Sequence, residues 1–519
     1  MSIFRRNLKE ARLILLFTCL KLVIHLAANS NFGFHRDELL YLALGDHLDW
    51  GFKEVPPFIA FISWLSGHLF GDSVFASRLI PSIAGAFIVY LTGLMVVHMG
   101  GKRFAVSAAC IGVILSPAFL ASQYLLQPVV FDQLFWTLAA YFMVKYIQTK
   151  KITYLYCLGV ACGIGMLNKY TMLLYGFSLF VGLLISSQRK MLFNRHVIGA
   201  MLVALLLFLP NLLWQISHDF PVLAHMRELK KTQLEYVDPF TFLLESLMIH
   251  ATGLLIWIPG MVYLFASRVK SKFTFISYAF VTTMVVLLLL HGKVYYGFGA
   301  YPALFAAGGL AWDRVMTRLT SPGRYTILGA CLVPALLFVP IAIPVLSLPV
   351  TVKFFAFASE KMDIDFPLRW EDQQMHATTQ DYADMLGWNE ITDHVEKAYS
   401  LVSAADKKFV TIFAENYGMA GAIDHLGKKY LLPKAVSFNS SYLLWAPASI
   451  EPKYLIYVSE ARGVPRVSAG FKSFQKVGEV LNPYAREKGA SVYLLWNPLD
   501  GIRNTYEAKL KEARSGKSD

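Results

Sequence analysis

Charged residues are scarce in this sequence. They make up 16% of its 519 residues, while 56% of the residues are hydrophobic and 14% are aromatic. Soluble globular domains usually carry about a quarter charged residues. The charges that are present lie in short segments between long apolar runs. This arrangement excludes an ordinary soluble protein and predicts a polytopic membrane protein.

Cysteine is also rare, and its positions exclude a disulfide framework. The five cysteines all lie inside apolar runs, at Cys19, Cys110, Cys157, Cys162 and Cys331. The less apolar part of the chain after Pro349 has none, so it must be held by a hydrophobic core of its own. Cys157 and Cys162 have no histidine or further cysteine at ligand spacing, and we interpret them as core-filling residues.

The net charge of +13 does not come from one basic stripe or tail. The basic residues are therefore poorly explained as a nucleic-acid-binding surface. The basic residues cluster in alternate loops instead, for example at 102–103, 150–151 and 189–190. By the positive-inside rule these loops face the cytoplasm. The intervening loops and the C-terminal part are then expected on the opposite side of the membrane. We expect membrane lipids as partners, and no nucleic acid.

Apolar runs long enough to cross roughly 30 Å of hydrocarbon number about eleven. The predicted spans are residues 11–28, 74–98, 104–124, 129–147, 153–168, 170–187, 197–214, 242–266, 273–290, 298–311 and 325–348. The first span lacks a convincing cleavage site and is interpreted as an anchor. The stretch 57–70 is too short to cross and is predicted to be a helix lying in the interface.

The drop in hydropathy after Pro349 predicts two domains. Residues 1–349 are expected to form a mainly α, transmembrane helix bundle, and residues 350–519 an extracytoplasmic α/β domain. Short β-branched or aromatic runs predict strands, and polar–apolar periodicity predicts helices. The predicted strands are 409–413, 454–458 and 491–495; a helix is expected at 381–400, a helix or tight turn at 418–427, and a solvated helix or frayed end at 507–519.

The most informative residues follow the first span. His35 and Arg36 precede an acidic pair, Asp37 and Glu38, where the chain should leave the membrane. Carboxylates close to lipid are costly and are candidate functional groups for that reason. Adjacent helical residues point about 100° apart, so only one of the two acids can face a given cavity. Alternatively, the pair stabilises the first turn of a helix starting at Arg36 through the helix dipole.

A second carboxylate, Asp132, lies at the exported end of the fourth span, at the depth expected for Asp37. Two acids brought together are a common way to build an acid/base or sugar-binding site. Asp132 taken alone is equally well explained as a helix N-terminal acid. Two acids on the same side of the membrane favour the functional interpretation.

Lone cations occur on that same side. Lys169 and Lys293 each lie between two apolar spans without a nearby acid in the sequence, and each could hold a phosphate group as a point charge. The alternative is a lysine that reaches toward the interface from a helix end. His218, His225 and His250 lack metal-ligand spacing. No cofactor is assigned, and a divalent metal ion remains open.

Several motifs in order resemble those of glycosyltransferase family 39. The run HRDELLY at residues 35–41, followed by Pro56 and Pro57, resembles the first exported loop of that family, and FDQLFW at 131–136 resembles its second acidic motif. Further similar segments are LNKY at 167–170, GKVYYGFGAYP at 292–302 and NYGMAGAID at 416–424. The family includes protein O-mannosyltransferases and lipid A aminoarabinose transferases and has the GT-C membrane fold. The similar motifs span nearly the whole chain.

The resemblance implies a membrane glycosyltransferase of the bacterial inner membrane whose active site and C-terminal domain face the periplasm. It would move a sugar from a polyprenyl-phosphate donor to a cell-envelope acceptor, which could be lipid A, a glycan or a protein. The implied catalytic residues are Asp37, Glu38 and Asp132. The candidates for the donor phosphate are Lys293, Lys169, Lys53 and Arg36, and those for other substrate contacts are Glu54, Tyr296, Tyr301 and His35.

One position departs from the family. Many relatives have an acidic residue and then a lysine before the two prolines, whereas this chain has Glu54 and Val55. The acidic position is kept, but the lysine expected to touch the donor phosphate is absent. Lys53, Lys169 and Lys293 are the candidates for its role.

Two other classes of protein fit part of the sequence. A transporter or flippase of lipid-linked glycans would also carry charges within its membrane part. Inverted repeats or matching broken spans would favour it, and neither is clear in the sequence. A membrane-anchored binding protein that acts through its C-terminal domain would leave the acidic loop without a role.

Overall fold

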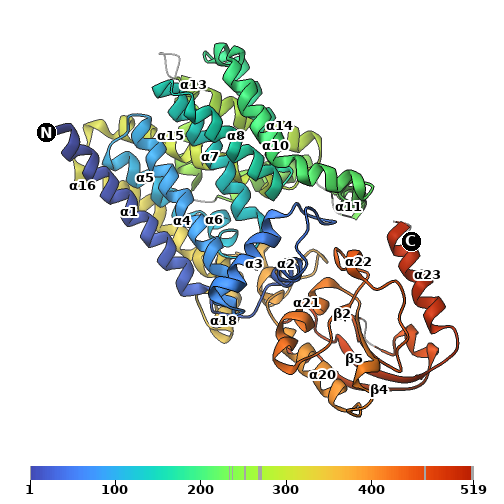
Figure 1. Cartoon of the computed structure of the whole chain (residues 1–519). Helices are drawn as coiled ribbons and strands as arrows, with labels where there is room; N and C mark the ends of the chain where they lie inside the picture. Colours follow the sequence, from blue (N-terminus) through green and yellow to red (C-terminus); the bar gives the residue numbers. More distant parts are fainter. Residues whose placement is uncertain are drawn as a thin grey trace. The chain divides into compact units, whose positions relative to one another are not determined.

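The computed structural model describes residues 2–232, 234–236, 238–250, 253–266, 272–460 and 463–515. Its contacts divide the chain into two compact units (Figure 1). The first unit comprises Met1–Asn29, Val55–Ile59 and Phe75–Val345, and the second comprises Ser30–Glu54, Ala60–Val74 and Leu346–Asp519. The assignment of residues 1–349 to the membrane and 350–519 to the periplasm stays a prediction.

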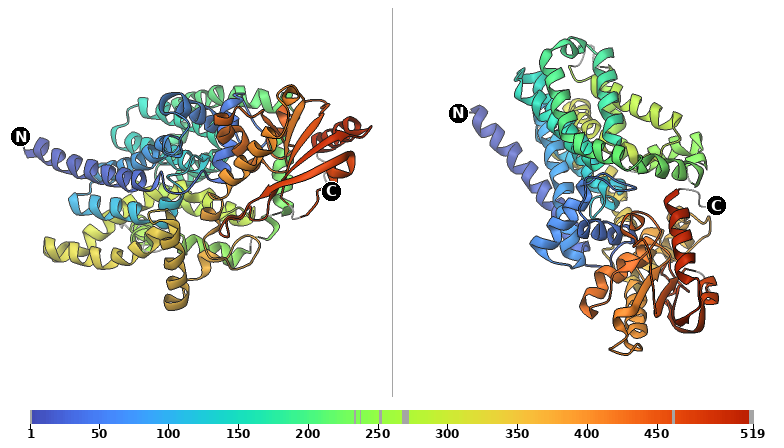
Figure 2. Two further views of the ribbon diagram at one scale, coloured as in Figure 1. Left: turned by 90° about the horizontal axis from the view of Figure 1, so that it is seen from below. Right: turned by 45° about the vertical axis from the view of Figure 1, so that its right-hand side comes forward.

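The first unit is built of helices. The long ones are α1 (Ser2–Ala28), α4 (Val74–His98), α7 (Pro128–Thr149) and α10 (Arg195–Ser217); α1 is the dark blue helix at the N-terminus in both views of Figure 2. The shorter ones are α5 (Arg103–Leu115), α6 (Pro117–Ala121), α8 (Thr153–Asn168), α9 (Thr171–Ile185), α11 (Pro221–Thr232), α12 (Pro239–Met248), α13 (Leu254–Ala266), α14 (Phe275–Leu289), α15 (Tyr301–Val315), α16 (Ser321–Leu332) and α17 (Val339–Ala342). Short 3₁₀ segments, including η4 (Val294–Ala300), connect some of them.

Among the described residues, four helical stretches are long and apolar enough to cross a membrane: Leu8–Ala28, Val74–His98, Arg195–Ser217 and Ser321–Ala342. In the most apolar window of the first and third of these, 22% of the residues are buried. Most of their apolar surface therefore faces outward, as expected for helices in lipid. The chain is accordingly a multi-pass membrane protein, and the number of about eleven spans stays a prediction.

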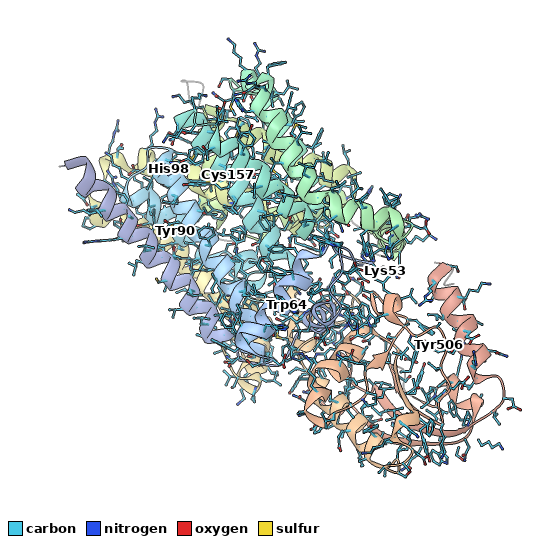
Figure 3. The ribbon with its side chains drawn as sticks, in the orientation of Figure 1. Lys53, Trp64, Tyr90, His98, Cys157 and Tyr506 are labelled. Atoms are coloured by element: carbon cyan, nitrogen blue, oxygen red, sulfur yellow. The ribbon has the colours of Figure 1, made fainter. Side chains whose placement is uncertain are left out.

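Several predicted spans are shorter or interrupted helices in the structure. The predicted span 104–124 consists of α5 and α6, which are separated at Ser116 because the following Pro117 starts a new helix. The predicted span 242–266 consists of α12 and α13, with Ala251 and Thr252 between them outside the described residues. The predicted interfacial helix is α3 (Phe58–Phe70), on which Trp64, labelled in Figure 3, is partly exposed.

Glycines let the helices of the first unit approach closely. A Cβ atom on Gly260 of α13 would lie 2.3 Å from the Leu304 carbonyl oxygen of α15, and one on Gly309 would lie 2.2 Å from that of Ala105. A Cβ on Gly159 of α8 would lie 2.3 Å from the carbonyl oxygen of Ala200 in α10. Small residues at helix crossings are typical of membrane helix bundles, where van der Waals packing drives association.

The second unit contains a five-stranded mixed sheet with the strand order β2-β1-β3-β5-β4. Its strands are β1 (Val410–Ala414), β2 (Ala435–Val436), β3 (Tyr454–Ser459), β4 (Phe471–Glu479) and β5 (Ser491–Pro498). β1 is parallel to β2 and β3, whereas β5 is antiparallel to β3 and β4. The three predicted strands correspond to β1, β3 and β5. β2 and β4 have no counterpart in the prediction, because β2 is very short and β4 is an edge strand with mostly polar residues.

Helices cover both faces of this sheet (Figure 1). The helices of the second unit are α2 (Arg36–Asp46), most of α3, α18 (Leu348–Met362), α19 (Gln380–Ala383), α20 (Trp388–Ser400), α21 (Tyr417–Leu426), α22 (Tyr442–Trp445) and α23 (Ile502–Ser515). On one face, Tyr506 and Leu510 of α23 pack against Phe413 of β1; Figure 3 labels Tyr506. On the other face, α20 contacts β3, β4 and β5, and α21 contacts β1 and β2. The helix predicted over 381–400 is broken where Gly387 adopts a φ of +90°.

Candidate functional site

The acidic pair begins α2, as the sequence predicted. The helix follows His35, whose Nδ1 accepts a hydrogen bond from the Asp37 backbone N–H at 3.1 Å. The Glu38 carboxylate reaches back and accepts a hydrogen bond from the His35 backbone N–H at 2.8 Å, which completes a capping box. Glu38 is fully buried, whereas Asp37 is partly exposed. The capping interpretation therefore fits Glu38, and a catalytic role for Glu38 stays a prediction.

Asp37 contacts a residue from the far end of the chain. The Tyr417 hydroxyl, from the first residue of α21, donates a hydrogen bond to Asp37 Oδ1 at 2.7 Å. The guanidinium of the neighbouring Arg36 lies 4.9 Å from the centre of the Tyr417 ring. Arg36 also lies 3.9 Å from a Glu460 oxygen and 4.0 Å from a Glu487 oxygen. The second unit thus surrounds Arg36 with carboxylates, and its proposed contact with a donor phosphate stays a prediction.

A second carboxylate of the same unit is held by two serines. Glu54 accepts hydrogen bonds from the hydroxyl groups of Ser440, at 2.5 Å, and of Ser441. The backbone N–H of Lys53, labelled in Figure 3, donates to the Ser441 hydroxyl at 3.0 Å. Burial raises the pKa of Tyr41 well above its usual range, and the charges of Asp37, Tyr417 and Glu54 add to this rise in that order. Asp37 and Glu54 are therefore both near Tyr41, so the second unit brings two predicted site residues into one neighbourhood.

His35 is fixed by the same unit. Its Nε2 lies 3.9 Å from an Asp384 oxygen, and Arg486 Nη1 donates to the same carboxylate at 3.0 Å. The Arg36 backbone N–H donates to the Asp384 carbonyl oxygen at 3.0 Å. Burial raises the pKa of Asp384, although the nearby cations oppose this rise. These contacts hold the start of α2, and a substrate contact of His35 stays a prediction.

α2 packs closely against α21 because α21 carries glycines on the contact face. A Cβ atom on Gly421 would lie 2.7 Å from the Leu39 carbonyl oxygen, and one on Gly418 would lie 2.8 Å from Arg36 Cγ. Contacts shorter than 3.0 Å to backbone atoms force a shift of one helix. The spacing between α2 and α21, and with it the contact between Asp37 and Tyr417, depends on these two glycines.

We expect Gly421→Ala to destabilise the second unit. The added methyl group would overlap with the Leu39 backbone, and overpacking of this kind costs about 1–3 kcal/mol. Thermal unfolding of the purified protein should show a melting temperature lower by several degrees. Gly329→Ala is the control, because a Cβ at Gly329 of α16 would have no atom within 4 Å. Equal melting temperatures for both variants would contradict the close approach.

The first unit holds a separate group of predicted site residues. Asp132, in the second turn of α7, accepts a hydrogen bond from the Thr171 hydroxyl at 2.8 Å through Oδ2. Its Oδ1 is buried and has no hydrogen bond to any residue in the described part of the chain. A buried carboxylate oxygen without a donor is costly, so this atom is available to a substrate hydroxyl or to water.

Lys169 lies over the rings of two tyrosines and precedes by two residues Thr171, whose hydroxyl binds Asp132. Its Nζ is 4.7 Å from the ring centre of Tyr295 and 4.6 Å from that of Tyr296. The charges of Asp132 and Lys293 both act on Lys169. Lysine held over aromatic faces is a cation–π arrangement, and it fixes the ammonium group without consuming its hydrogen-bond donors. The first unit therefore brings Asp132, Lys169, Lys293 and Tyr296 together.

Tyr301 occupies a core position in the first unit. Its ring is fully buried and lies 3.9 Å from the His250 ring, and its hydroxyl donates to the Ser246 carbonyl oxygen at 3.1 Å. These contacts explain the buried position of Tyr301 without a bound substrate, and its role in substrate binding stays a prediction. Within the described residues, no group of three or more His, Cys, Asp or Glu side chains could hold a metal ion.

Sequence reasoning missed several partners of the predicted residues: Tyr417, Ser440, Ser441, Thr171 and Tyr295. Tyr417 could have been selected as a site residue, because it follows the end of the predicted strand 409–413 within one of the family-like motifs. Thr171 and Tyr295 are sequence neighbours of Lys169 and Tyr296 and could have been included for that reason. Nothing in the sequence around Ser440 and Ser441 indicated that they would bind Glu54.

Comparison with known proteins supports the fold and part of the sequence pattern. The family model described as "Dolichyl-phosphate-mannose-protein mannosyltransferase" matches residues 54–214, which contain Glu54, Asp132 and Lys169. The lipid A galacturonosyltransferase RgtD of Rhizobium johnstonii is 26% identical over an alignment of 210 residues, and the match covers 38% of this chain and 41% of that protein. The match to RgtD thus spans less than half of its length.

Among solved structures, ArnT from Cupriavidus metallidurans is similar over almost the whole chain. The structure bound to undecaprenyl phosphate has a TM-score of 0.59 at 13% identity, and the apo structure has a TM-score of 0.60 at 14% identity. Both alignments cover 93% of this chain and 97% of ArnT. At this identity the likeness establishes the fold alone.

The chain therefore has the fold of ArnT, a mainly helical membrane fold followed by a C-terminal domain with a mixed sheet. The resemblance predicted from the sequence is confirmed: the protein is similar to the membrane glycosyltransferases that use sugars carried on lipid phosphates.

Proposed function

We propose that this protein transfers a sugar from a polyprenyl-phosphate donor to an acceptor of the cell envelope, on the periplasmic face of the inner membrane. The observation that carries the proposal is the partly exposed Asp37 carboxylate, held at the start of α2 by the Tyr417 hydroxyl. The family-model match through Glu54, Asp132 and Lys169 supports it. So does the fold shared with ArnT, which has been solved with undecaprenyl phosphate bound.

In the proposed reaction an acceptor oxygen attacks the anomeric carbon of the sugar. The bond between that carbon and the phosphate oxygen breaks, and the polyprenyl phosphate leaves with the bonding electrons. Where the acceptor is a hydroxyl group, Asp37 takes its proton. Where the acceptor is itself a phosphate, no base is required, and Asp37 orients the sugar.

The cations of the first unit are proposed to hold the donor phosphate. Lys169 has its ammonium group over the rings of Tyr295 and Tyr296, near Lys293, and this pair would neutralise the phosphate as it leaves. Asp132 is proposed to bind a sugar hydroxyl through its free Oδ1.

Lipid A is the acceptor that we propose first, because RgtD, the curated relative, is a lipid A galacturonosyltransferase. The test is mass spectrometry of lipid A, envelope glycans and proteins from cells with and without the protein, followed by transfer assays in liposomes with the purified full chain. Release of polyprenyl phosphate together with a sugar adduct on the acceptor supports the proposal. Movement of the donor across the bilayer without its consumption would favour a flippase instead.

A further inference from the structure

The N-terminus of α21 lies at the carboxyl ends of two parallel strands. β1 ends at Ala414 and its neighbour β3 ends at Ser459, and α21 starts at Tyr417. The carboxyl ends of parallel strands are where open α/β sheets usually place their ligand-contacting groups. Tyr417 therefore occupies a position in the sheet domain at which functional side chains are common.

Polar contacts fix the backbone at this position. The Asn416 side chain caps α21 by accepting a hydrogen bond from the Met419 N–H at 2.9 Å, and its Nδ2 donates to Glu460 Oε1 at 2.5 Å. Asn416 is fully buried. Because its side chain bonds both to its own helix and to the residue after β3, Tyr417 has little freedom to move away from the sheet.

The packing of α2 against α21 then sets the distance between Tyr417 and Asp37. Gly418 and Gly421 allow this approach, as described above, and the Arg36 guanidinium lies over the Tyr417 ring. Burial, and next the Asp37 carboxylate, raise the pKa of Tyr417 well above its usual range. The phenol consequently stays protonated and donates its hydrogen bond at every pH at which the protein would work.

We propose that Tyr417 is a positioning residue for the transfer reaction: its hydroxyl holds the Asp37 carboxylate in the orientation that acts on the substrate. The inference rests on the proposed function and deepens it, because it gives the C-terminal sheet domain a part in the reaction centre. The C-terminal domain would then supply a side chain that positions a catalytic residue.

The test compares Tyr417→Phe with a matched variant, Tyr430→Phe. Tyr430 makes the same two kinds of contact at a more exposed place in the domain: its hydroxyl donates to Asp393 Oδ1 at 2.8 Å, and Lys429 Nζ lies 4.5 Å from its ring centre. Each variant loses one hydroxyl group that bonds to an aspartate and keeps the ring under its cation. In liposomes with a polyprenyl-phosphate sugar donor, Tyr417→Phe should lower kcat by roughly 10- to 100-fold with little change in the KM of the donor. Tyr430→Phe should leave both unchanged.

A second measurement, of melting temperature, tests whether the Tyr417 and Asp37 side chains stabilise the protein through the same hydrogen bond. The decreases in melting temperature caused by Tyr417→Phe and by Asp37→Ala should not add in the double variant, since each replacement removes the same hydrogen bond. A kcat for Tyr417→Phe within twofold of wild type would overturn the inference, as would equal kcat losses in the two phenylalanine variants. If the wild-type protein itself transfers no sugar from the donors, the proposed function fails, and this outcome is distinct from a failure of the Tyr417 inference.

Discussion

Asp37→Asn is expected to lower the kcat of sugar transfer by roughly 100- to 10,000-fold, the range typical of losing a positioned general base. Asparagine has nearly the shape of aspartate and can still accept the hydrogen bond from the Tyr417 hydroxyl. Folding and membrane insertion should therefore be intact, while the group that takes the acceptor proton or orients the sugar is lost. The measurement is the rate of polyprenyl-phosphate release from the donor in liposomes.

The control for this variant is Asp46→Asn. Asp46 ends the same helix and pairs with Lys434 at 2.7 Å and Lys428 at 3.8 Å, so it is an acid of α2 with a structural partner. Its replacement should change kcat little. Wild-type turnover of the Asp37→Asn variant would remove Asp37 from the reaction and, with it, the main support for the proposed function.

Lys169→Ala is the second replacement with a large expected effect. If the ammonium group binds the donor phosphate, its loss should weaken donor binding by roughly 10- to 150-fold, since hydrogen bonds to charged groups contribute about 1.5–3 kcal/mol. The affinity for the acceptor should change much less. Both can be measured separately in titrations of the purified protein with polyprenyl phosphate and with acceptor.

Lys150→Ala serves as the control for Lys169→Ala. Lys150 also lies over a tyrosine, with its Nζ 5.6 Å from the ring centre of Tyr146. It follows the C-terminal end of α7, however, whereas Asp132 lies near the N-terminal end of that helix. Removing it tests whether the loss of any lysine from a ring face lowers donor affinity. Equal weakening of donor and acceptor by Lys169→Ala would contradict a phosphate-binding role and would favour the alternative of an interface lysine.

The start of α2 shows which part of the site local sequence rules could predict. The acidic pair and the helix beginning at Arg36 follow from composition and the helix dipole. The capping box was not visible, because the residue at the N-cap is His35 and the usual signature has serine or threonine there. The different tasks of Asp37 and Glu38 could therefore be expected from their helical spacing, but their partners could not be assigned.

Long-range contacts limited the prediction more than local structure did. Strands β1, β3 and β5 have β-branched or aromatic residues and were predictable, whereas the polar edge strand β4 was not. Asp37 and Tyr417 are 380 residues apart in the chain, and nothing in either segment specifies the other. The glycines of α21 gave a small-residue pattern, but only the structure shows that this face packs against α2.

The chain path through the second unit restricts how the protein can be divided. Two segments from the N-terminal part, Ser30–Glu54 and Ala60–Val74, fold together with Leu346–Asp519. A fragment starting at Leu346 would lack α2 and expose the glycine face of α21 to solvent. Conversely, a truncated enzyme that ends before Leu346 would keep Asp37 but lose the serines that bind Glu54. Neither half should be active alone, and complementation between separately expressed halves would require them to assemble during folding.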